Sequence, residues 1–148
     1  MSHKYQINEN NILIGGNLIS FPPETTIQNV EEFSKVLCFS TWPKEKDLNW
    51  KDPNTNNIWK KRCLNNPSKV FCYDYSGVFK WEFPYDKVVG IQKEVPEALS
   101  KDNFISREHF ERYLQEFKDK ELITIYAGDY QFTVDANTGE IYDRVVSR

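Results

Sequence analysis

The sequence predicts an α+β fold, in which a mainly antiparallel β-sheet of hairpins carries one amphipathic helix. Three patterns predict it. Residues 70–83 and 130–142 are each a run of aromatic and β-branched residues that reaches a polar turn with glycine and then resumes, which is typical of an antiparallel pair. Between them, residues 106–120 place apolar side chains at helical spacing. We expect at least six strands, with the helix packed on the sheet.

Length and composition indicate one domain over residues 1–148, because a chain of this size buries roughly 70% of its extended surface on folding. The three cysteines, Cys38, Cys63 and Cys72, lack CxxC spacing, and two of them lie in apolar runs typical of buried thiols. No segment approaches the roughly 20 apolar residues that cross a bilayer, and no apolar signal stretch opens the chain. We therefore expect a cytoplasmic protein with no membrane segment.

The first predicted elements are a hairpin and a buried strand. Residues 12–14 and 17–21 flank a Gly-Gly pair, and two glycines accept the positive φ angles of a two-residue turn. Residues 33–39 form the next predicted strand. Its residues 36–39 are all apolar, which indicates a strand that is buried on both faces in the middle of a sheet.

Residues 43–68 interrupt this pattern and are predicted to be a long loop or an insertion. They contain three prolines, several asparagines, and Trp50 and Trp59 among lysines. Tryptophans interleaved with basic groups can bind single-stranded nucleic acid by stacking and phosphate contact. We favour tryptophans that anchor the loop to the core, because six basic against three acidic side chains between residues 44 and 62 make a weak field.

The middle of the chain continues with strands. In residues 79–83 three aromatic side chains alternate with Lys80 and Glu82, so one face of this strand is expected to be apolar. Residues 87–92 predict a further strand.

The helix that follows has a well-marked start. Ser106 is the expected N-cap, and Ile105 and Phe110 stand at the positions of a hydrophobic staple. One stripe of this helix carries Phe110, Tyr113, Leu114 and Phe117. We expect the stripe to lie across the apolar face of the sheet.

Three strands, over residues 122–126, 130–134 and 141–146, are predicted to close the chain. The last two flank the turn DANTG, in which Asp and Asn side chains bond the turn and Gly accepts the left-handed conformation. The turn resembles the start of a calcium loop. However, Gly139 comes one place early and Val146 stands where an EF-hand needs a bidentate Glu, so we expect no calcium site.

Motifs for catalysis are missing from the sequence. The two histidines, His3 and His109, have no flanking nucleophile signature and no metal-ligand spacing. Three strand-end carboxylates, Asp129, Asp135 and Asp143, can be imagined as the centre of a small hydrolase, but acidic residues near hairpin ends are normally solvated. We expect no enzyme, no catalytic or metal site, and no cofactor.

Four segments together resemble a family of small bacterial proteins. They are NNILIGGNLISFP (10–22), LCF (37–39), VFCYDYSGVFKW (70–81) and YQFTVDANTGEI (130–141). In this order they look like immunity proteins encoded beside polymorphic toxins, including those of contact-dependent growth-inhibition systems. Residues 43–68 depart from the resemblance as an insertion.

The resemblance implies a protein that binds one cognate toxin domain in the cytoplasm of the producing cell and neutralises it, usually by covering the active site of the toxin. When the toxin is a nuclease, the inhibiting surface is often acidic because the substrate cleft is basic. Residues 69–148 agree with this, since they carry 11 Lys and Arg against 15 Asp and Glu. The candidate contacts are acidic or aromatic residues of this half: Glu82, Tyr85, Asp86, Asp129, Tyr130 and Asp143. The alternative function is a nucleic-acid or ligand-binding module that uses the Trp and Lys residues of 43–68.

Overall fold

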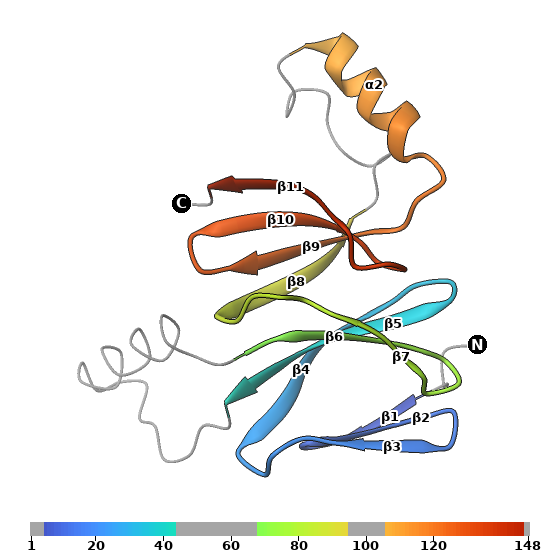
Figure 1. Ribbon diagram of the computed structural model, residues 1–148, viewed down its shortest axis with the longest axis vertical. Helices are drawn as coiled ribbons and strands as arrows, with labels where there is room; N and C mark the ends of the chain where they lie inside the picture. The colour runs from blue at the N-terminus through green and yellow to red at the C-terminus, as the bar shows by residue number, and fades with distance from the viewer. Residues whose placement is uncertain (1–4, 44–67, 95–105, 147–148) are drawn as a thin grey trace, which may run out of the picture.

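The computed structural model describes residues 5–43, 68–94 and 106–146, and in these it contains eleven strands and one helix. Every strand pair is antiparallel and joins strands that follow one another in the chain. The pairs form three sheets, which Figure 1 shows one above another along the long axis of the molecule. The predicted fold class, mainly antiparallel hairpins with a single helix, is confirmed.

The three sheets follow chain order. The amino-terminal sheet contains β1 (Tyr5–Asn8), β2 (Asn11–Ile14) and β3 (Asn17–Ser20). The central sheet contains β4 (Thr25–Glu32), β5 (Val36–Pro43), β6 (Val70–Asp74) and β7 (Phe79–Glu82). The carboxyl-terminal sheet contains β8 (Val88–Glu94), β9 (Leu122–Ala127), β10 (Tyr130–Asp135) and β11 (Ile141–Val146).

The first core lies between the central and the carboxyl-terminal sheets. The central sheet and the residue after β7 contribute Val36, Cys38, Val70, Cys72, Trp81 and Phe83, and the opposite side contributes Val88, Ile123, Ile125, Ala127, Phe132, Val134 and Ala136. Along one side of this sandwich the edge strands β4 and β8 approach each other, and the N–H of Lys93 donates to Oε2 of Glu31 at 3.2 Å. On the other side lie the edge strands β7 and β11.

The second core lies between the central and the amino-terminal sheets. Its buried residues are Ile12, Ile14, Ile27, Leu37 and Phe39. Strand β5 therefore serves both cores: Val36 and Cys38 face the first, whereas Leu37 and Phe39 face the second. The prediction that residues 36–39 form a strand buried on both faces in the middle of a sheet is confirmed.

Several local predictions are also confirmed. Gly15 and Gly16 have φ angles of 55° and 85° in the two-residue turn between β2 and β3. Helix α2 (Arg107–Phe117) begins after Ser106, whose Oγ accepts a hydrogen bond from the N–H of His109 at 3.2 Å. The hairpin predicted over 70–83 and the strands predicted at 87–92, 122–126, 130–134 and 141–146 are all present, and their ends differ from the expected ones by two residues at most.

Two strands were not predicted. Both β1 and β4 are rich in polar residues, and β4 (Thr25–Glu32) buries only Ile27 among its eight residues. Strand β1 alternates over only four residues, the shortest run that identifies a strand in sequence, and β4 lacks the alternation altogether. They form because their backbone N–H and C=O groups hydrogen-bond to those of the neighbouring strands β2 and β5.

The apolar face predicted for residues 79–83 is partly wrong. Trp81 and Phe83 lie in the first core, but Phe79 is 51% exposed on the opposite face, where its ring lies 5.6 Å from that of Tyr73. The cause is a register shift in the β6–β7 pair between Cys72 and Tyr73. An extra residue in one strand moves the following side chains to the other face.

The helix packs on the sheet at a place other than the one expected. The Phe117 ring of α2 lies 5.1 Å from that of Tyr142 in β11, and Tyr113 hydrogen-bonds Glu94 at the end of β8. The apolar face of the carboxyl-terminal sheet, on which the helix was expected to lie, is covered by the central sheet instead. Two facing sheets bury more apolar surface than an 11-residue helix can cover, so the sheets pair and the helix is left at the end of the sheet (Figure 1).

The stretch predicted as a loop or an insertion, residues 43–68, lies outside the described residues except for its ends. Pro43 ends β5, and Ser68 is buried just before β6. Trp50 and Trp59, on which the nucleic-acid alternative depends, are therefore not described.

Candidate protein-binding surface

Two tyrosines are exposed together on the side of the sandwich where β7 and β11 lie. The ring of Tyr85 stacks on that of Phe132 at 5.4 Å between centroids and 21° between planes, and the ring of Tyr130 lies 6.1 Å from the same Phe132. Phe132 is buried, and Phe83 contacts it edge-on at 5.0 Å. Tyr85 and Tyr130 are 49% and 38% exposed, so both tyrosines rest on buried rings and still present area to solvent.

The backbone holds this pair in place. The N–H of Gly128, in the turn between β9 and β10, donates to the carbonyl of Lys87 at 3.1 Å, and the N–H of Val88 donates to the carbonyl of Ser68 at 3.3 Å. Lys87 has a φ of 62°, a conformation rarely adopted outside glycine, so the loop that carries Tyr85 turns sharply into β8. These bonds join the loop of Tyr85 to the turn that precedes Tyr130.

Three charged residues lie next to the two tyrosines in the chain or in the fold. Asp86 and Asp129 are exposed and are the chain neighbours of Lys87 and Gly128, whose backbones are bonded to each other. The guanidinium carbon of Arg144 lies 4.7 Å from the centroid of the Tyr130 ring. We call the set of Tyr85, Asp86, Asp129, Tyr130 and Arg144 the tyrosine surface. Four of its five residues were predicted as partner contacts.

Arg144 was missed because its place depends on strand register. It pairs with Phe132 across the β10–β11 ladder and is a diagonal neighbour of Tyr130 on the same face. A register shift between Thr133 and Val134 alters this pairing from the one that the turn would give by counting. The alternation in β11 alone therefore does not reveal its contact with Tyr130.

The other two predicted contacts lie elsewhere. Glu82 pairs with Phe71, which packs against the second core, and forms an ion pair with Lys69 at 2.9 Å. Asp143 pairs with Thr133, so it lies on the face of the carboxyl-terminal sheet opposite to Phe132 and Arg144. The structure does not bring Glu82 or Asp143 to the tyrosine surface.

The carboxylates considered for a hydrolase do not converge. Asp129 precedes β10 and Asp135 ends it, so a whole strand separates them. Asp135 is buried, and its Oδ1 accepts the N–H groups of Asn137 and Thr138 at 2.8 and 3.1 Å while its Oδ2 accepts the hydroxyl of Tyr142 at 2.7 Å. Both carboxylate oxygens of Asp135 are therefore engaged in hydrogen bonds that stabilise the turn and its contact with Tyr142. In the part of the chain that the structure describes, no three His, Cys, Asp or Glu residues group as metal ligands.

The cysteines also serve packing. Cys38 and Cys72 are fully buried and pair across β5 and β6, and the carbonyl of Ala136 accepts hydrogen bonds from both thiols, at 3.9 and 3.4 Å. The indole Nε1–H of Trp81 donates to the same carbonyl at 2.8 Å. Burial, together with the hydrogen bond and charge interaction with Cys72, raises the pKa of Cys38 well above its ordinary value. A protonated, inaccessible thiol is a poor nucleophile.

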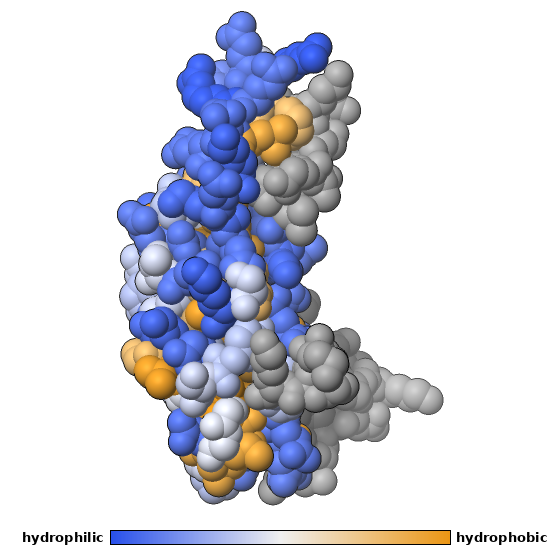
Figure 2. Space-filling view, turned by 90° about the vertical axis from the view of Figure 1, so that its right-hand side faces the viewer, coloured by the Kyte–Doolittle hydropathy of each residue, from blue (hydrophilic) through white to orange (hydrophobic). Residues whose placement is uncertain are grey.

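The described surface has no single large apolar patch on the side that Figure 2 shows. Figure 2 shows that the described surface on one side is mainly hydrophilic, with apolar residues in separate patches. Among the described residues, no helix combines the length and the apolar character needed to span a bilayer.

Comparisons of the chain with protein-family models, with curated proteins and with solved structures found no match.

Proposed function

We propose that this chain is a cytoplasmic immunity protein that binds a cognate bacterial toxin domain in a stoichiometric complex and so neutralises it. The tyrosine surface is its contact site. The observation that carries the proposal is the pair of half-exposed tyrosines stacked on the buried ring of Phe132. Together with the resemblance of four sequence segments to immunity proteins, it supports a binding function.

Tyrosine suits such a contact for energetic reasons. Aromatic residues and arginine are enriched among the few interface residues that dominate binding energy. Tyr85 is already restrained by Phe132 and by the bonded loop, so little side-chain entropy remains to be lost on binding. A preorganised surface of this kind favours tight inhibition without catalysis.

The charges at the tyrosine surface favour a protein over a nucleic acid. Asp86 and Asp129 flank the rings, and both are exposed. Carboxylates at the rim repel phosphate, whereas they suit the basic side chains of a protein such as a nuclease toxin. The same surface carries Arg144, so a complementary partner presents both basic and acidic side chains to it.

The test is co-expression with the toxin domain encoded by the neighbouring gene, combined with calorimetry of the two purified proteins. We expect restored growth and a 1:1 complex. Replacement of Tyr85 and Tyr130 by Ala should weaken binding by at least 100-fold, since each truncated hot-spot side chain costs about 2 kcal/mol or more.

The matched control is Phe79→Ala, because Phe79 is an aromatic residue that is 51% exposed on the other face of the central sheet. It should bind within about threefold of the wild type, which corresponds to less than 1 kcal/mol. A neighbourhood without a toxin gene, or toxin that stays active in the presence of the protein, would contradict the proposed function. Equal losses for Phe79 and the two tyrosines would contradict the proposed surface.

A further inference from the structure

We infer that Arg144 is the charged recognition group of the tyrosine surface, and that it binds a carboxylate side chain of the partner protein. The inference rests on the proposed function and adds the chemistry of the contact. For a nuclease toxin the resemblance implies an inhibiting surface that is often acidic, and Arg144 is not among the residues that the sequence indicated.

The position of Arg144 is determined by two neighbours. Its guanidinium carbon lies 4.7 Å from the ring centroid of Tyr130, within the range in which a cation is attracted to the face of an aromatic ring. Tyr130 is in turn held against buried Phe132. The guanidinium is therefore held over an anchored ring, in contrast to a freely rotating surface arginine.

No hydrogen bond or ion pair between described residues uses the guanidinium of Arg144. Among the described residues, the ion pairs within 4.0 Å join Lys69 to Glu82 and Arg107 to Glu111, and neither involves Arg144. The adjacent carboxylate, Asp143, accepts a hydrogen bond from the backbone N–H of Arg144 at 2.8 Å. With respect to the part of the chain that the structure describes, the guanidinium thus keeps its planar set of N–H donors for an external acceptor.

An external carboxylate is the acceptor that fits best. The guanidinium fork binds carboxylate and phosphate with two parallel hydrogen bonds. The exposed carboxylates of Asp86 and Asp129 balance the exposed charges of Lys87 and Arg144, so this surface has no net positive charge to attract a phosphate-rich ligand. An Asp or Glu side chain, placed where the partner covers Tyr85 and Tyr130, meets both requirements.

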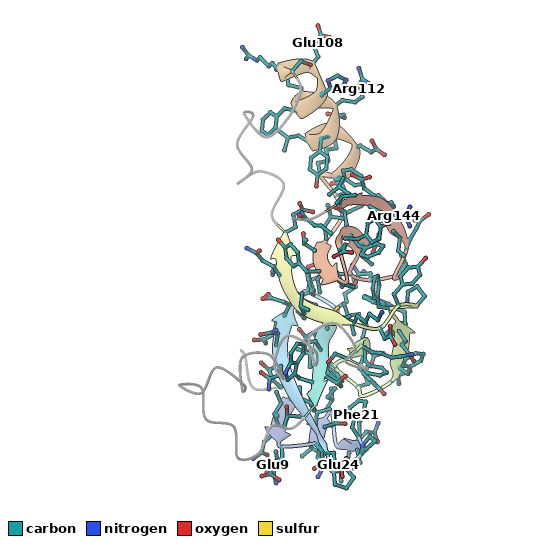
Figure 3. The ribbon with its side chains drawn as sticks, turned by 90° about the vertical axis from the view of Figure 1, so that its left-hand side faces the viewer. Glu9, Phe21, Glu24, Glu108, Arg112 and Arg144 are labelled. Atoms are coloured by element: carbon teal, nitrogen blue, oxygen red, sulfur yellow. The ribbon has the colours of Figure 1, made fainter. Side chains whose placement is uncertain are left out.

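The first experiment measures binding of the toxin domain to the variants Arg144→Lys and Arg144→Gln by calorimetry. Lys keeps the charge but loses the fork, so we expect both variants to bind at least tenfold more weakly. Arg112→Lys is the control, because Arg112 is an exposed arginine on α2 and lies far from Arg144 (Figure 3). It should bind within twofold of the wild type. Equal thermal unfolding midpoints for the four proteins show that the fold is intact.

The second experiment locates the carboxylate. Each exposed Asp and Glu of the toxin domain is replaced by its amide, and each variant is titrated with the wild type and with Arg144→Gln. For one carboxylate we expect a loss of at least tenfold against the wild type and almost no further loss against Arg144→Gln. This non-additivity identifies a direct contact.

The outcomes separate the inference from the proposed function. If the wild type does not bind the toxin domain, both fail. If the wild type binds and inhibits but Arg144→Lys binds equally well, or no toxin carboxylate couples to Arg144, the inference is wrong and the proposed function stands. Binding of an oligonucleotide that is lost in Arg144→Gln would assign the guanidinium to phosphate and also overturn the inference.

Discussion

The two cores on either side of the central sheet are closed in different ways. In the first core the indole of Trp81 bonds the carbonyl of Ala136, so a side chain of one sheet is tied to the backbone of the other. In the second core the turns themselves meet: a Cβ on Gly15 would lie 2.5 Å from the carbonyl oxygen of Tyr75. The amide of Asn17 donates to the carbonyl of Ser76 at 2.9 Å across the same contact.

This difference bears on function. Polar bonds across the first core specify one relative position of the central and carboxyl-terminal sheets, because a shifted arrangement would leave buried donors unpaired. The tyrosine surface rests on both of these sheets, since its rings pack on Phe83, which follows β7, and on Phe132, which lies in β10. Its geometry is therefore as precise as that of the first core. The second core lies on the far face of the central sheet.

The largest effect is expected where a turn of the first core packs against Trp81. In Gly139→Ala the new Cβ would lie 2.7 Å from Cγ of Trp81, and the residue would keep a φ of 80°. Strain in the left-handed region and overpacking together should destabilise the protein by about 4 kcal/mol. Urea unfolding followed by tryptophan fluorescence measures this.

The matched control is Gly128→Ala, which has a φ of 60° but no atom within 4 Å of the added Cβ. It should cost about 1 kcal/mol, from backbone strain alone. Equal losses in the two variants would show that the turn does not pack closely against Trp81.

A slightly smaller effect is expected in the second core. In Gly15→Ala the added Cβ meets backbone atoms of Tyr75 and Ser76 within 2.8 Å, so the two turns must separate, and we expect a loss of about 3 kcal/mol. The adjacent Gly16→Ala has a φ of 85° and open space around its Cβ, and should lose about 1 kcal/mol. Chemical unfolding of both variants gives the comparison. Similar stability of the two would indicate that the turns are not in contact.

Binding of the toxin domain by the Gly15→Ala variant also tests the difference between the two cores. Gly15→Ala disturbs the core away from the tyrosine surface, so the folded fraction should bind the toxin domain within about threefold of the wild type, less than 1 kcal/mol. Loss of binding by folded Gly15→Ala would show that the second core also shapes the interface.

The smallest effect concerns Glu121, which joins the first core to the turn before β5. Its Oε2 accepts the N–H of Ser34 at 2.9 Å, and its Oε1 accepts the hydroxyl of Ser34 at 2.7 Å and the amide of Asn137 at 3.2 Å. Burial alone would raise the pKa of Glu121, but these hydrogen bonds to the ionised form outweigh burial and lower the pKa.

A lowered pKa in the folded state means that the stabilisation is complete above the unfolded value near 4.5 and is lost as the pH falls through the folded value. Glu121→Gln should therefore be less stable by about 1 kcal/mol at neutral pH, and the difference should shrink in acid. Urea unfolding at pH 7 and pH 3.5 measures it, with Glu116→Gln on the exposed face of α2 as control. A difference that is independent of pH would contradict the role of the carboxylate.

The turns and the helix N-cap were predicted well from the sequence. The Gly-Gly turn at Gly15, the N-cap at Ser106 and the Asp135 turn all depend on residues within five positions of one another, so their physics is visible in the sequence. The position of Phe79 was predicted wrongly, because a register shift depends on the partner strand. The site of the helix was predicted wrongly because a competing sheet covers the apolar face.

The sequence by itself determined the hairpins within residues 12–21, 70–83 and 130–146, the helix, and the burial of residues 36–39 on both faces, because turn residues and alternation act over short distances. It also marked Tyr85, Asp86, Asp129 and Tyr130 as separate residues of interest. Only the tertiary structure brought these four together, added Arg144, and left Glu82 and Asp143 elsewhere. The reason is that contacts between strands depend on how sheets pair and register, and this is decided by the burial of the whole chain.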